Sequence, residues 1–305
     1  MLVTMKEILE HANAENYAVP APNVATELDA RAFLEVAEEL QSPIILDVNY
    51  RANPDIELLG KMLIMLCEKT NVPVALHLDH GYPHNKFVQQ LVALRAGFTS
   101  IMVDYSQLPY EENIDHTVRM TEIAHTLGVT VEAELGYVAL GKDYDTAHMQ
   151  FTDPEQAADF VKRTGIDALA IAIGNAHGIY KGEPKLDLER LRAIKEATGG
   201  IPLVLHGSSF LKKDELCKAC SMGLNKINVN HEMMESAIEH INNAQWDGDN
   251  TFQLYKVLRI GLKKRLAELI QTCYGSQGKS FGVRHSSIHD VIMEVQGGFF
   301  SMSEI

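Results

Sequence analysis

The sequence predicts one (β/α)₈ barrel with a C-terminal extension, on three observations. Eight short apolar runs rich in β-branched residues alternate with longer segments of helical periodicity, which favours a parallel sheet. The runs are apolar along their length, as in strands covered on both faces. The length of 305 residues suits one barrel of about 250 residues with insertions. An open doubly wound sheet is the alternative, but no G-x-G-x-x-G follows the first run to indicate a dinucleotide site.

The elements can be placed in order along the chain. Residues 1–19 are typical of a short helix that leads into the first strand. The eight predicted strands are residues 18–24, 43–49, 72–80, 100–106, 129–136, 168–174, 202–208 and 226–230. Helices are predicted between them, including residues 26–40, 56–70, 111–127 and 187–198. Asp153 and Pro154 form a helix start signal, whereas residues 137–151 are predicted to be a long, mobile and functional connection.

Charge and hydropathy exclude two classes of partner. The formal net charge of −14 disfavours nucleic acid, whose phosphates an acidic surface repels. No apolar run approaches the roughly 20 residues that a membrane helix needs, and the N-terminus lacks the pattern of a signal peptide. We therefore expect a cytoplasmic protein that binds neither nucleic acid nor membrane.

Polar residues gather where the predicted strands end, which is the catalytic face of a barrel. His80, His177 and His206 follow three different strands. Three imidazoles leave a fourth position open, as in a catalytic zinc site. Asp79, beside His80, is either a general acid or base or a carboxylate that orients a histidine.

Other strand-end residues allow more than one interpretation. Asp104 and Glu134 have three possible roles. They support the metal ligands, form an alternative metal position, or are ordinary polar residues at strand ends. The Gly- and Asn-containing segments after the sixth, seventh and eighth strands either bind phosphate through backbone N–H groups or form tight turns. Their residues are Gly178, Gly207, Ser208, Ser209, Asn228, Asn230 and His231.

Five motifs stand in the order of a known family. They are HLDHG at 77–81, VEAELG at 131–136, AIGNAHGIYKGEPKLD at 172–187, LVLHGSS at 203–209 and KINVN at 226–230. Together they resemble the class II, zinc-dependent ketose-bisphosphate or fructose-bisphosphate aldolases. The resemblance implies a barrel over residues 1–278. Residues 279–305 then form a tail, either loosely held or packed on a neighbouring subunit.

The resemblance also implies a role for each matching residue. His80, His177 and His206 match the zinc ligands, and Asp79 matches the residue that exchanges a proton with the aldehyde oxygen. Asp104 and Glu134 match positions for an alternative or second metal. Dihydroxyacetone phosphate would contact Asn23, Gly178, Gly207, Ser209 and Asn228, with Ser208, Asn230 and His231 in the same segments.

Departures from the family pattern concern the substrate and not the metal. Phe210 replaces a small residue beside the phosphate position, and His231 replaces a threonine. The family carries an acidic residue in its mobile loop to move the carbon-bound proton. That place falls at Lys142, with Asp143 and Asp145 close by.

The predicted function is reversible cleavage of a phosphorylated ketose to dihydroxyacetone phosphate and an aldehyde. Fructose and tagatose 1,6-bisphosphate are example substrates. Zn²⁺ is the expected cofactor, a monovalent cation is a further candidate, and the resemblance suggests a homodimer or homotetramer. Two alternatives stay open: a paralogue that binds zinc and a sugar phosphate with little turnover, and a metal-dependent epimerase that uses the same enediolate.

Overall fold

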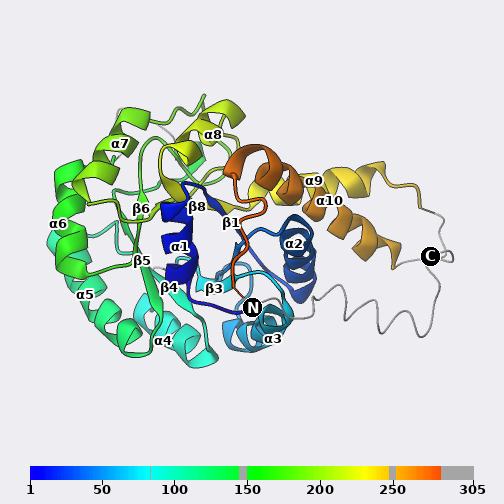
Figure 1. Cartoon of the computed structure of the whole chain (residues 1–305), viewed down its shortest axis with the longest axis horizontal. Helices are drawn as coiled ribbons and strands as arrows, with labels where there is room; N and C mark the ends of the chain where they lie inside the picture. The colour runs from blue at the N-terminus through cyan, green and yellow to red at the C-terminus, as the bar shows by residue number, and fades with distance from the viewer. Residues whose placement is uncertain (83, 144–149, 247–251, 283–305) are drawn as a thin grey trace.

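Eight parallel strands form the centre of the molecule, as the computed structural model shows (Figure 1). The structure describes residues 1–82, 84–143, 150–246 and 252–282. Their order is β1-β8-β7-β6-β5-β4-β3-β2, and a parallel bridge between Asn23 and Asp47 joins β1 to β2. The predicted (β/α)₈ barrel is therefore confirmed. The strands are β1 Val19–Pro22, β2 Ile44–Val48, β3 Val74–Leu78, β4 Ser100–Val103, β5 Thr130–Leu135, β6 Ala168–Ile171, β7 Leu203–Leu205 and β8 Leu224–Val229.

Helices surround the barrel, and α1 lies across its end (Figure 1). They are α1 Met5–Ala14, α2 Glu27–Leu40, α3 Ile56–Lys69, α4 Lys86–Ala96, α5 Tyr110–Thr126, α6 Pro154–Thr164, α7 Leu188–Ala197, α8 Lys213–Ser221, α9 His231–Asn243 and α10 Gln253–Leu269. The start signal expected at Asp153 is confirmed, because its side chain accepts the N–H groups of Glu155 and Gln156. No helix in the described ranges is long and apolar enough to span a membrane.

Strand alternation divides the buried side chains between two environments. One set of side chains from each strand packs outward against the helices. The other set points into the barrel, where an apolar group rests on α1 through Met5, Ile8, Leu9 and Ala12. Helix α1 thus closes the amino-terminal end of the barrel, and polar side chains occupy the levels nearer the carboxyl-terminal rim. The rim is therefore the open end, where a site can form.

The two segments outside the barrel repeat are only partly described. Residues 137–143 lie along the rim and end in a 3₁₀ helix, η1 (Gly141–Asp143). After α10 the chain forms a π-helix, η2 (Ile270–Tyr274), and Ser280 donates its N–H to the Gln41 carbonyl at 2.8 Å. The rest of the predicted tail, residues 283–305, lies outside the described residues.

Replacing Leu9 with alanine should destabilise the fold by about 2 to 5 kcal/mol, because it opens a cavity between α1 and the barrel interior. Leu9 is 1% exposed. Urea unfolding measures the change. Leu127→Ala is the control, since Leu127 is 61% exposed and its loss should cost less than about 0.5 kcal/mol. Equal effects in the two variants would contradict this account of α1.

Candidate metal centre

Three histidines from separate strand ends meet at the rim. His80 lies two residues beyond β3, His177 lies in the segment after β6, and His206 directly follows β7. Each offers a ring nitrogen, and these atoms all lie within 4.8 Å of one another. The ring of His80 is centred 4.6 Å from that of His206 and 5.1 Å from that of His177. The sequence-predicted histidines are thus brought together.

A left-handed turn carries His80 into this cluster. Strand β3 ends at Leu78, and His80 itself takes a φ of 45°. Non-glycine residues seldom adopt this conformation, and it often marks functional sites. The positive φ falls on the histidine and not on the following Gly81. The turn frees His80 from strand alternation, so it can share a site with Asp79.

The residues fit a bound divalent metal. His80 Nδ1 pairs with Asp104 Oδ2 at 3.1 Å, whereas His80 Nε2 is buried without a hydrogen-bond partner among the described residues. A buried polar atom of this kind is costly unless a ligand satisfies it. A second possible group, His80 with Asp104 and Glu134, shares the same imidazole. Three imidazoles with adjacent carboxylates are a donor set suited to a catalytic metal.

Asp79 lies beside the histidines and is held by three amides. Its oxygens accept hydrogen bonds from Asn23 Nδ2 at 3.0 Å, Asn228 Nδ2 at 3.1 Å and Asn49 Nδ2 at 3.4 Å. Burial alone would raise the pKa of Asp79, but the charge of His80 and these contacts lower it below its usual range. The site therefore presents an oriented, ionised carboxylate that can accept a proton.

Two further carboxyl groups differ in protonation. Ser106 Oγ bridges them, at 2.8 Å from Asp104 Oδ1 and 3.0 Å from Glu134 Oε1. Burial opposes ionisation of Asp104, yet the hydrogen bond with His80 and the charge of Lys86 hold its pKa well below the usual value. Burial and the Asp104 charge raise the pKa of Glu134 to about 8. Without a metal, Asp104 is thus ionised and Glu134 carries a proton at neutral pH.

The histidines also divide into two kinds. Burial works against a charge on His80, but Asp79 and Asp104 raise its pKa to about 10. Burial and the His80 charge lower the pKa of His177 to about 4 and that of His206 well below its usual value. Neutral imidazoles are the form that binds a metal, so two of the three are already in that form.

The predicted substrate residues line the neighbouring segments. Gly207 has a φ of 63°, and a Cβ there would lie 2.2 Å from the Ala176 carbonyl oxygen, so only glycine fits. Ser208 Oγ donates to the Asn228 carbonyl at 2.6 Å, which ties the segment after β7 to β8. Ser209 is buried, and Gly178, with a φ of 80°, follows the candidate ligand His177.

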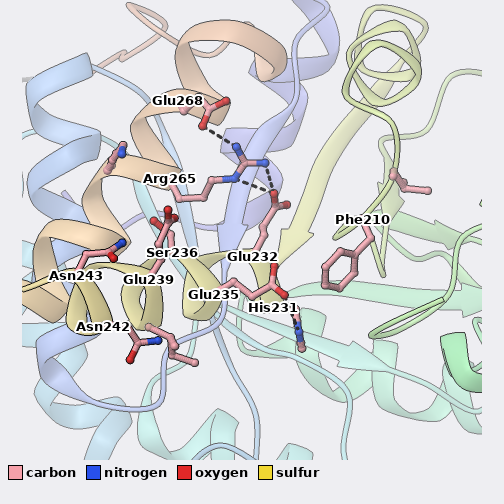
Figure 2. Close-up of a pocket in the computed structure, with 13 residues that line it drawn as sticks. Phe210, His231, Glu232, Glu235, Ser236, Glu239, Asn242, Asn243, Arg265 and Glu268 are labelled. Atoms are coloured by element: carbon pink, nitrogen blue, oxygen red, sulfur yellow. Dashed lines mark hydrogen bonds and ion pairs between the residues drawn. The ribbon is translucent and has the colours of Figure 1, made fainter.

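Phe210 and His231 pack together where the family has smaller residues. Their ring centroids are 4.9 Å apart, and Figure 2 shows the Phe210 ring turned toward His231. Phe210 has a φ of 70°, a left-handed conformation that favours glycine. His231 begins α9 after its N-cap residue Asn230. The pair forms one end of a groove of about 940 Å³ lined with glutamates of α9.

The connection after β5 is anchored to the candidate centre. His177 donates its N–H to the Ala139 carbonyl at 2.8 Å, and the Gly141 N–H donates to the His177 carbonyl at 2.7 Å. Lys142, in η1, is exposed. The side chain of Asp143 and the whole of Asp145 lie outside the described part of the chain, so their predicted roles are untested.

Four residues at or below the rim were not predicted to belong to the site. Asn49 contacts Asp79, and Lys86 Nζ lies 3.0 Å from Asp104 Oδ2. Glu132 Oε1 lies 2.8 Å from His206 Nε2, and Lys226 contacts Glu132. Strand alternation could have indicated the last two, since Glu132 shares a face with Glu134 and Lys226 with Asn228.

Comparisons with known proteins point to one family. The family model described as "Fructose-bisphosphate aldolase class-II" matches residues 3–279. The chain is 40% identical to fructose-bisphosphate aldolase of Geobacillus stearothermophilus, over 92% of this chain and 99% of that one. The corresponding enzyme of Staphylococcus aureus strain Mu50 is 42% identical, over 76% and 82%. The crystal structure of the YdjI aldolase from Escherichia coli K12 superposes with a TM-score of 0.81 at 34% identity, covering 92% and 100%.

The metal-free protein should lose stability as the pH falls from about 6.5 toward 4, in part through His177. Its folded pKa of about 4 lies below the value of about 6.5 expected in the unfolded chain. The unfolded state therefore takes up the proton first, and stability declines over that window. We expect a smaller drop in melting temperature between about pH 7 and pH 5 for His177→Gln than for the unmodified protein. The exposed His84→Gln is the control, and an unchanged drop in His177→Gln would contradict the assignment.

Proposed function

Because this chain belongs to the class II fructose-bisphosphate aldolase family, whose members are metal-dependent carbon–carbon lyases, we propose that it is a zinc-dependent aldolase for a phosphorylated ketose. The proposed reaction is reversible cleavage to dihydroxyacetone phosphate and an aldehyde. The observation that carries the proposal is the cluster of His80, His177 and His206 with the ionised Asp79 beside it. Zn²⁺ is the proposed metal because three imidazoles with an open position suit it. A monovalent cation is proposed as an additional cofactor.

Each side chain has a defined task in this reaction. The three histidines would hold the metal, which supplies Lewis-acid polarisation of the ketose carbonyl when bound. Asp79 would take the proton from the hydroxyl group whose carbon leaves as the aldehyde, and return it in the reverse direction. Asn23 and Asn228 keep the Asp79 carboxylate oriented through their amide N–H groups, so little reorganisation precedes the proton transfer.

The phosphate end of the substrate is proposed to lie between the segments after β7 and β8. Gly207, Ser208 and Ser209 form the first of these segments, which Ser208 ties to Asn228. His231 adds the N-terminus of α9, which favours an anion. The side chains of Phe210 and His231 leave less room for the phosphate than would the small residue and the threonine of the family pattern. We therefore propose that the ketose need not be fructose 1,6-bisphosphate, and that its substituents must suit this aromatic wall.

Assembly and location complete the proposal. Family membership supports a homodimer or homotetramer in the cytoplasm. Large apolar side chains also lie exposed on the α9–α10 hairpin, among them Ile238, Phe252, Tyr255 and Ile260. Mass measurement in solution by light scattering tests the assembly, and a monomer at all concentrations would contradict it.

Removing the metal should abolish cleavage of the ketose. We expect the zinc-loaded protein to release a triose phosphate from at least one member of a ketose 1-phosphate and 1,6-bisphosphate panel. A chelator should stop the release, and added Zn²⁺ should restore it. Coupled reduction of the triose phosphate measures turnover. If ligands stabilise the protein thermally but no panel member is cleaved, the paralogue with little turnover is favoured. Solvent deuterium entering the substrate without cleavage would favour the epimerase.

Asp79→Asn should lower kcat by about 100- to 10,000-fold, the usual contribution of a general acid–base group. The asparagine keeps the shape but cannot accept the proton. Zinc content, measured by atomic absorption, should stay at the level of the unmodified protein. Asp115→Asn, at an exposed position of α5, is the control. Turnover by Asp79→Asn within a few-fold of the original would remove Asp79 from the mechanism.

A further inference from the structure

A layer of charged side chains lies inside the barrel, one level below the histidine cluster. Lys226 of β8, Glu132 of β5, Asp47 of β2 and His77 of β3 all point inward and are 0% exposed. Helix α1 and the apolar interior level separate this layer from solvent on its other side. The proposed mechanism assigns none of these four residues a task.

Glu132 links this layer to the candidate metal centre. One of its oxygens, Oε2, accepts a hydrogen bond from Lys226 Nζ at 2.9 Å. The other, Oε1, lies 2.8 Å from Nε2 of His206. With both oxygens engaged, the Glu132 carboxylate has one orientation available. His206 is the only one of the three clustered histidines with a described hydrogen bond to this layer.

Lys226 is the cation that faces both carboxyl groups of this layer. Burial raises the pKa of Asp47 well above its usual value, and Asp47 Oδ2 lies 3.5 Å from Lys226 Nζ. Burial opposes the Lys226 charge, but Asp47 and Glu132 raise its pKa. Lys226 Nζ lies closer to Glu132, at 2.9 Å, than to Asp47, so Glu132 is its nearer partner.

Stability does not explain such a pair. Removing two charges from water costs several kcal/mol per ion, and apolar residues of similar volume often stabilise a core as well or better. A buried carboxylate behind a metal-binding histidine has a known physical effect: it fixes the proton on one ring nitrogen and the orientation of the ring. At this site that proton would lie on Nε2, which leaves the lone pair on Nδ1.

The surroundings of Nδ1 agree with this assignment. Asn228, two residues after Lys226 on the same strand, places its Nδ2 3.2 Å from His206 Nδ1. Asp79 Oδ1 lies 3.8 Å from the same nitrogen. His206 Nδ1 thus faces the catalytic side of the ring, while Nε2 faces the buried layer.

We propose that Lys226 and Glu132 are positioning residues that set the tautomer and orientation of His206, so that its Nδ1 faces the metal position shared with His80 and His177. The inference rests on the proposed function, because it takes the histidine cluster as a metal centre. Lys226 acts through Glu132 and touches neither substrate nor metal.

Two double variants, both uncharged at positions 132 and 226, separate the effect of the hydrogen bond to His206 from that of the buried charges. Glu132→Leu with Lys226→Met removes the acceptor, whereas Glu132→Gln with Lys226→Met keeps an amide oxygen for His206 Nε2. Neither double variant leaves an unpaired buried charge. We expect the zinc dissociation constant of the Leu/Met variant to rise about 10- to 100-fold. The Gln/Met variant should recover most of that loss. Competition with a fluorescent zinc chelator measures the constant without any assay of turnover.

Ser100→Ala is the matched control. Ser100 is 0% exposed and contacts the same layer, because its hydroxyl lies 2.7 Å from His77 Nδ1, but it has no described contact with His206. Its zinc affinity should equal that of the unmodified protein. Circular dichroism and melting temperature establish that each variant is folded.

Several results would overturn the inference. One is a Leu/Met variant that binds zinc as tightly as the original, and another is a Gln/Met variant that binds no better than Leu/Met. If Leu/Met does not fold, Glu132→Gln alone decides. With Lys226 in place, the single amide oxygen turns to the ammonium group and the NH2 group faces His206 Nε2, so zinc binding should weaken about 10-fold, and unchanged affinity would refute the inference. Should the unmodified protein itself bind no zinc, the proposed function fails instead.

Discussion

The closed barrel imposes the constraint on which the rest of the structure depends. Every second residue of each strand points into one narrow interior that α1 seals at its amino-terminal end. Inside, each polar group must find a partner from another strand or contact a ligand, because water is excluded. Apolar residues fill the level beside α1, charged residues pair in the middle, and the histidine cluster forms at the open rim.

This constraint explains why the candidate metal centre is asymmetric. Asp104 holds one histidine from the rim, Glu132 holds another from inside the barrel, and His177 is held through the backbone of residues 139–141. Each of the three candidate ligands is thus held from a different part of the barrel. The buried Nε2 of His80 has no hydrogen-bond partner among the described residues, and a bound cation would satisfy it.

Different interactions place the residues at the proposed phosphate end of the substrate. Phe210 takes a left-handed conformation that costs a bulky residue more than it costs glycine, and its ring packs on His231. Neither residue contacts the histidine cluster in any described hydrogen bond or ring contact. The proposed metal site and the proposed phosphate site can therefore vary separately, which fits a chain whose departures from the family pattern fall at Phe210 and His231.

The sequence by itself determined the barrel and the strand ends that bear the histidines, since periodicity and chain order are local properties. It also placed Asp79 beside His80. Only the tertiary structure decided that His80 makes the turn, and that Asn49 and Lys86 reach the carboxylates of the site. It likewise joined Lys226 to Glu132 across the barrel, although 94 residues separate them in the chain. Such contacts depend on strand tilt and stagger, which set the level at which side chains from distant strands meet, and no local pattern encodes that level.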